Sequence, residues 1–244
     1  MVKLLRKIRQ QFLFENKTGR YFKYAIGEIV LLVIGILIAL QINNWNENRK
    51  IRQQEEILLT DIHTEFKYNM SELKSNLTRY DQARKNLARI IDLFPIDYRT
   101  IELDTLAFLL ERTHFDGNYD YSNTSLEKIR NSSSYDIISN VELRNLLLQW
   151  EVLLADYIET ESWTINHHEE RYSPTLGNNF PRPYIRGFKD PRANLQFLGS
   201  IEFEGLIQSR RGKINGLFRL VRLDEKQNNI MNTIERIIEL SNGD

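Results

Sequence analysis

The 244-residue chain contains no cysteine, which excludes disulfide bonds and any chemistry that needs a thiolate. Glycine and proline are scarce, at 11 and five residues, and such scarcity is typical of a mostly helical protein. Neither sign of charge is in excess, because 33 Lys and Arg balance 33 Asp and Glu. The chain as a whole therefore lacks the basic excess of proteins that bind nucleic acid, and we expect no nucleic-acid partner.

The sequence also lacks the motifs of common enzyme chemistry, including a phosphate-binding loop, a dinucleotide fingerprint and a nucleophile elbow. His63 and His114 are isolated in the sequence, and the only cluster of metal-type residues is HHEE at 167–170. Adjacent histidines on a helix point about 100° apart, so they share an ion poorly, and a solvated helix end is the favoured interpretation. We expect no catalytic residue, cofactor or metal, and no enzymatic activity.

What the chain does have is one long apolar run, YAIGEIVLLVIGILIALQI, from Tyr24 to Ile42. As a helix it reaches about 28 Å, close to the thickness of a bilayer core. A cleaved signal peptide is the alternative, but its apolar region is normally about 7–15 residues and ends at a small-residue cleavage site. The run is longer, and Asn43, Asn44 and Trp45 follow it. We therefore predict an uncleaved transmembrane helix over residues 23–43, embedded in a lipid bilayer.

The flanks of this run predict its orientation. Basic residues dominate before it, whereas acids and bases mix after it. The positive-inside rule places the N-terminus in the cytoplasm and everything from about Asn43 outside. The prediction is a single-pass protein of the bacterial inner membrane with a periplasmic C-terminal domain. Residues 1–22 are predicted to be a basic amphipathic segment at the cytoplasmic interface, whose apolar residues are Leu4, Leu5, Ile8 and Phe12. The alternative is a disordered, positively charged flank.

Glu28 lies inside the apolar run, where a carboxylate is costly. At 100° per residue it shares a face with Gly35 and Ala39, a small-xxx-small pair that allows close approach of a second helix. The favoured hypothesis is that this face packs against another transmembrane protein or a second copy of the chain. Two alternatives stay open: Glu28 is an incidental acid solvated at the interface, or it has an ion- or proton-linked role.

Residues 44–244 are predicted to form an all-α, bundle-like extracytoplasmic domain that follows the transmembrane helix. An apolar stripe without Pro or Gly runs from Ile51 to Phe94, and Pro95 ends it. Further helices are expected at Thr105–Thr113 with Asp104 as cap, at Ser125–Arg130, from the capping box Ser139–Glu142 to Tyr172, and from Ser200 to Leu240.

The segment Ser173–Gln196 contains four of the five prolines and is predicted to be a long irregular loop. Aromatic and basic residues alternate in it. Three interpretations are open: an ordered cover over the end of the helices, a loop that contacts a partner, and a site for an anionic ligand. The residues of the predicted partner loop are Phe180, Arg182, Tyr184, Arg186 and Phe188.

Two stretches resemble a known group of proteins. LLRKIRQQFLFENKTGRYFKYAIGEIVLLVIGILIALQINNWNENRK, residues 4–50, and SLEKIRNSSSYDIISNVELRNLL, residues 125–147, are similar to the shared segments of a family of single-span membrane proteins typical of Bacteroidota, classed as a domain of unknown function. The resemblance implies an inner-membrane anchor and a periplasmic domain, and it implies no catalytic residues.

The function predicted from these features is protein binding, as a scaffold, accessory subunit or assembly factor of a membrane complex. Two alternatives remain: an ion-coupled subunit of a membrane complex that uses Glu28, and a helical bundle that senses a small ligand.

Overall fold

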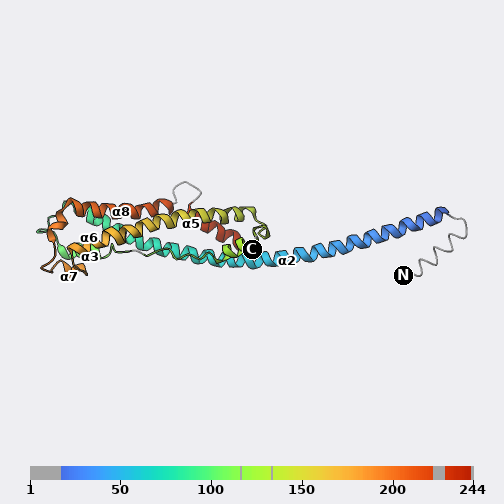
Figure 1. Ribbon diagram of the computed structural model, residues 1–244, viewed down its shortest axis with the longest axis horizontal. Coiled ribbons are helices and arrows are strands. Elements are labelled where there is room, and N and C mark those ends of the chain that lie inside the picture. The colour runs from blue at the N-terminus through green and yellow to red at the C-terminus, as the bar shows by residue number, and fades with distance from the viewer. Residues whose placement is uncertain (1–17, 116, 133, 222–228, 243–244) are drawn as a thin grey trace. The chain divides into compact units, whose positions relative to one another are not determined.

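The computed structural model describes residues 18–115, 117–132, 134–221 and 229–242, and all regular structure within them is helical (Figure 1). The expected all-helical class is therefore confirmed. The elements, labelled as in Figure 1, are α2 (Thr18–Ile91), α3 (Leu103–Glu111), α4 (Thr124–Ser132), the 3₁₀ turn η1 (Ser134–Ile137), α5 (Val141–His167), the π-helical η2 (His168–Tyr172), α6 (Ser173–Asn179), α7 (Tyr184–Gly187), the 3₁₀ turn η3 (Leu195–Gly199), α8 (Ile201–Val221) and α9 (Ile230–Ser241).

The chain divides into two compact units, Met1–Glu55 and Glu56–Asp244. The described part of the first unit belongs to α2, and this is the one described helix that is long and apolar enough to cross a membrane. Its large apolar side chains from Ile29 to Ile42 are between 45% and 71% exposed. None of the described residues buries this apolar stretch of α2. The predicted amphipathic segment lies mostly in residues 1–17, outside the described residues.

The second unit is built on the predicted stripe of α2. Ile62, Phe66, Leu73, Tyr80 and Leu87 are all buried, as expected for one face of a helix at steps of three and four residues. α5 packs against α8 and α9 (Figure 1). Side-chain contacts, such as that between Phe66 and Trp150, join α5 to α2. α2 ends at Ile91, four residues before Pro95, so the predicted stop is confirmed to within one turn.

Two predicted helix caps are wrong. α3 begins at Leu103 with Glu102 as N-cap, so Asp104 lies inside its first turn. α5 begins one residue later than the capping-box pattern implies. Asn140 is its N-cap, and its side-chain oxygen accepts a 3.0 Å hydrogen bond from the N–H of Leu143.

The later helices differ more from expectation. The α5 helix does not stop at Tyr172, because η2 and α6 continue it to Asn179 across residues that were predicted to be loop. Pro174 is tolerated because it stands in the first turn of α6. The single helix expected from Ser200 to Leu240 is two helices, α8 and α9. Asn229, in an extended conformation, caps α9 through a 2.9 Å bond from the N–H of Asn232.

Candidate functional site

The first candidate surface is the predicted packing face of the apolar helix. Glu28, Gly35 and Ala39 are all exposed on α2. A Cβ added to Gly35 would meet nothing within 4 Å, so packing within the described chain does not require glycine there. The geometry leaves this face open to another helix or to lipid, and partner contact by these residues stays a prediction.

The second candidate, the proline-rich segment, is more ordered than a free loop. The rings of Phe180, Tyr184 and Phe188 are buried, and Phe180 packs on Phe188 with 4.9 Å between ring centroids. Arg182 pairs with Glu111 at 3.2 Å and is exposed, as is Arg186. The aromatic half of the predicted partner loop therefore belongs to the core, and any partner contact falls to the two arginines.

Most cations of this segment are already neutralised by acids of the same unit. Lys189 pairs with Asp104 at 2.9 Å, and Arg192 pairs with Asp190 at 2.7 Å. The Arg192 guanidinium lowers the pKa of the Asp190 carboxyl to about 2. An anionic ligand would have to displace these acids, so the arrangement does not favour the anion-site interpretation of this segment.

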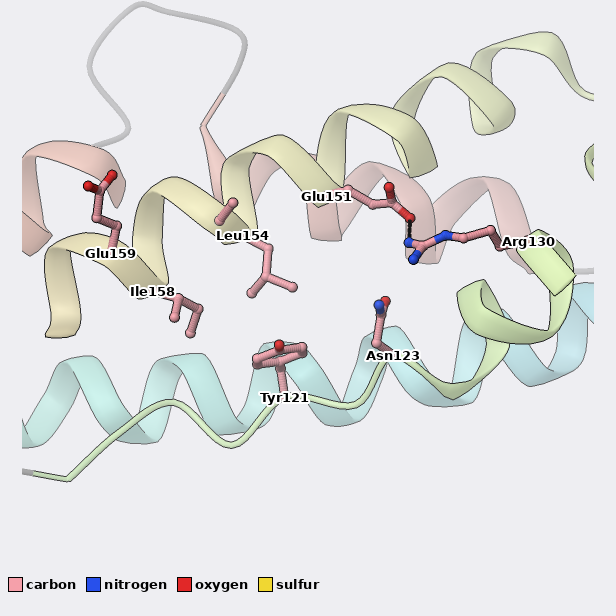
Figure 2. Close-up of a pocket in the computed structure, with 8 residues that line it drawn as sticks. Tyr121, Asn123, Arg130, Glu151, Leu154, Ile158 and Glu159 are labelled. Carbon is pink, nitrogen blue, oxygen red and sulfur yellow. Dashed lines mark hydrogen bonds and ion pairs between the residues drawn. The ribbon is translucent and has the colours of Figure 1, made fainter.

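A third surface, missed by sequence reasoning, is a groove of about 450 Å³ beside α5, hereafter the α5 groove (Figure 2). One wall comes from α5 and the other from the extended residues before α4, as Figure 2 shows. Its lining residues are Tyr121, Asn123, Arg130, Glu151, Leu154, Ala155, Ile158 and Glu159.

The chemistry of the α5 groove is amphipathic. Leu154 and Ile158 project from α5 toward the Tyr121 ring and form an apolar floor (Figure 2). At one end Arg130 of α4 forms an ion pair with Glu151. Beside this pair, the buried Oδ1 of Asn123 accepts no hydrogen bond from the described residues. The groove can therefore take an apolar group together with a hydrogen-bond donor.

An exposed apolar row runs along α5 next to this groove and consists of Val141, Leu148, Val152 and Ala155, hereafter the α5 row. At 100° per residue these side chains lie within about 60° of one another. Val152 is 62% exposed and Leu148 51% exposed. The opposite side of α5 supplies Leu147, Trp150 and Leu154 to the core, so α5 is apolar on two faces while only one is covered by the chain.

The structure brings together two histidines that are 54 residues apart in the sequence. His114 Nδ1 lies 3.1 Å from His168 Nε2, and His114 Nε2 lies 2.7 Å from the Tyr184 hydroxyl. Nearby, the Thr113 and Tyr172 hydroxyls share a 2.6 Å hydrogen bond. His114 is therefore not isolated, and His168 is buried, so the expected solvated helix end is wrong for His168.

This cluster is held without charge on His114. Burial, followed by the Arg182 cation, His168 and the Arg210 cation, lowers the pKa of His114 to about 3. Burial also raises the pKa of Tyr172 to about 12. A neutral imidazole donates one hydrogen bond and accepts one, which suits a chain from Tyr184 through His114 to His168. These hydrogen bonds join three segments of the fold. Among the described residues, no group of three metal-type side chains could hold an ion.

Over the described residues, these features define an all-helical class of protein with one candidate membrane span near its N-terminus and a second unit with an open apolar face. The chain belongs to a family described as a family of unknown function (DUF6090), whose match covers residues 28–150. The expected membership of a family of unknown function is thereby confirmed, whereas the Bacteroidota origin stays a prediction. No curated protein and no solved structure matches the chain.

Proposed function

We propose that this protein is a single-pass protein of the bacterial inner membrane whose extracytoplasmic helical bundle binds another protein. Its role is that of a scaffold, accessory subunit or assembly factor of a membrane complex. The apolar residues from Ile29 to Ile42 support the anchor, because side chains so exposed need lipid around them. The basic residues before Tyr24 favour a cytoplasmic N-terminus.

The observation that carries protein binding is the α5 row. Scattered exposed apolar residues are normal on a protein surface, but Leu148, Val152 and Ala155 follow one another at steps of four and three residues beside a groove with polar ends. Such a grouping is typical of an interaction site. Leu148 and Val152 lie next to the acids Glu151 and Asp156, which supply a polar rim. A protein partner would remove the row from water, which stabilises a complex by about 25 cal/mol for each Å² of apolar area buried.

Site-specific photocrosslinking in living cells tests this proposal. A photoreactive amino acid at Val152 should give a discrete crosslinked product with one partner. Leu148→Asp should abolish that product, because it places a charge in the row. Leu148 is 51% exposed, so the charge faces water and does not enter the core. The same photoreactive residue at Lys67, an exposed position on α2, is the matched control and should give no discrete product. Equal products from both positions, or a Val152 product that Leu148→Asp leaves unchanged, would refute binding through this row.

A further inference from the structure

A second hollow of about 700 Å³ lies further along α5, at its C-terminal end, and is lined by residues of α5, η2 and α8. We call it the α5–α8 hollow. Its lining residues are Trp163, Asn166, His167, Glu170, Arg171, Ser209 and Lys213. It has no residue in common with the α5 groove, and its volume lies within the range of small-molecule sites.

The charges of this hollow are arranged for an anion. Arg171 and Lys213 are exposed, and neither forms an ion pair with the described residues. One acid, Glu170, also lines the hollow, so the lining carries a net positive charge. This arrangement contrasts with Arg182, Lys189 and Arg192 of the proline-rich segment, which acids of the same unit already neutralise.

His167 reports the electrostatic environment of the hollow. Burial, followed by the cations Arg210, Lys213 and Arg171, lowers its pKa to about 4. The ring is therefore neutral at neutral pH, and its Nε2 lies 3.0 Å from the Ser209 hydroxyl. Its buried Nδ1 has no hydrogen-bond partner among the described residues. The cations that add to the effect of burial on the pKa of His167 also attract an anion to the same place.

The apolar part of the hollow is an aromatic surface. Trp163 is 55% exposed, whereas Trp150 on the same helix is fully buried. A half-exposed indole offers a flat ring face and an N–H donor, the combination that recurs at ligand and partner sites. The cations can also approach the ring of a bound molecule that stacks there.

The backbone at this hollow is unusual as well. The five residues His168–Tyr172 form a π-helical turn that begins directly after His167 and includes Glu170 and Arg171. π-helical turns are rare and occur often at functional sites. Arg171 of this turn lines the hollow together with Trp163 and His167 of α5.

We propose that the α5–α8 hollow binds a small planar aromatic anion, with its ring on Trp163 and its acidic group between Arg171 and Lys213. Ser209 and Asn166 are the neutral polar side chains within reach of the bound molecule. The proposal does not depend on protein binding at the α5 row, because the two surfaces use different residues.

Fluorescence quenching of the full-length protein in lipid nanodiscs tests it. Trp45→Phe removes the exposed indole of the first unit. The two remaining tryptophans are then Trp163, which is exposed and serves as the reporter, and Trp150, which is buried. The probe is 4-nitrobenzoate, an aromatic carboxylate that quenches indole on contact. Quenching should saturate with 4-nitrobenzoate, whereas the uncharged 4-nitrobenzamide should quench only in proportion to its concentration.

Variants assign the binding to the hollow. Arg171→Gln with Lys213→Gln should raise the apparent Kd for 4-nitrobenzoate by at least about tenfold, because two charge-assisted contacts are lost. Lys67→Gln with Arg89→Gln removes the same charges from exposed positions on α2 and should leave the Kd within about twofold. Quenching that does not saturate, that is equal for the amide, or that the first pair of substitutions leaves unchanged would overturn the proposal.

Discussion

The carboxylate of Glu161 on α5 accepts a 3.0 Å hydrogen bond from the amide of Asn76 on α2, and both side chains are buried. The other carboxylate oxygen accepts a 2.9 Å bond from the backbone N–H of Tyr119, and the Tyr157 hydroxyl donates to the Asn76 oxygen at 3.2 Å. Burial raises the pKa of Glu161, while the two bonds that it accepts act against this shift. A polar network thus joins α2, α5 and the extended segment between α3 and α4.

Asn76→Ala should destabilise the second unit by about 1–3 kcal/mol, because it leaves a buried carboxylate oxygen of Glu161 without its donor. Asn145→Ala, at an exposed position of α5, should cost less than about 0.5 kcal/mol. Urea denaturation of the full-length protein, followed by tryptophan fluorescence, gives both values. Equal losses in the two variants would mean that the network does not stabilise the fold.

Leu73→Ala should cost about 2–5 kcal/mol, because Leu73 is fully buried on the core face of α2, as its place in the stripe predicted. Leu148→Ala makes the same chemical change at a leucine that is 51% exposed and should cost less than about 1 kcal/mol. The free energies of unfolding from denaturant titrations compare the two. A cost near zero for Leu73→Ala would contradict its core position.

The second unit should lose stability in mild acid because of His114. Its folded-state pKa of about 3 lies below the ordinary value of 6.5, so the unfolded chain takes up a proton that the folded chain refuses. The stability is complete above about pH 6.5 and falls as the pH drops below it, by at most about 1.4 kcal/mol per pH unit for this one group. His167, whose pKa is also lowered, acts in the same direction.

Denaturant titrations at pH 7.5, 6.5 and 5.5 measure this dependence. His114→Gln removes the titrating ring and should give a shallower loss between pH 6.5 and 5.5 than the parent chain. A variant that loses stability as steeply as the parent would show that His114 is not the group responsible.

Gly35→Leu should weaken association within the membrane while leaving insertion intact. A bulky side chain at the closest approach separates two helices, and packing is the main attraction between helices in lipid. Val33 lies on the opposite side of the same helix, about 160° from Gly35. Val33→Leu should therefore leave crosslinking unchanged. Glu28→Gln keeps the shape of the side chain and should retain most of the association. Unchanged membrane crosslinks in Gly35→Leu would contradict helix packing on this face.

Local periodicity explains which parts of the fold were predictable. The stripe of α2, the end before Pro95 and the helix after Asn140 follow from side-chain spacing and from caps within a few residues. The pairings of His114 with His168 and of Asn76 with Glu161 depend on how distant segments pack, and no local pattern carries that information. The caps at Glu102 and Asn140 were missed because the neighbouring Asp104 and Ser139 fit the same short motifs. The cap at Asn229 was missed because one continuous helix was expected there.

The candidate sites divide in the same way. The face of Glu28, Gly35 and Ala39 follows from helical geometry alone, whereas the α5 groove and the α5–α8 hollow need the tertiary arrangement. For the proline-rich segment three interpretations stayed open, because the sequence does not show whether its aromatic side chains are buried. Phe180 and Phe188 pack on each other inside the core. The composition of the segment does not tell a buried aromatic ring from an exposed one.

Membrane topology tests the proposed anchor most directly, and the cysteine-free chain makes the measurement clean. Single cysteines are introduced as Lys3→Cys before the apolar run and as Ser162→Cys at an exposed position of α5. A membrane-impermeant maleimide is added to cells whose outer membrane is permeabilised and whose inner membrane is intact. Labelling at Ser162→Cys alone, with Lys3→Cys labelled only after lysis, is the expected result. Labelling of Lys3→Cys in intact cells, or recovery of the protein in the soluble fraction, would contradict a single span with the N-terminus in the cytoplasm.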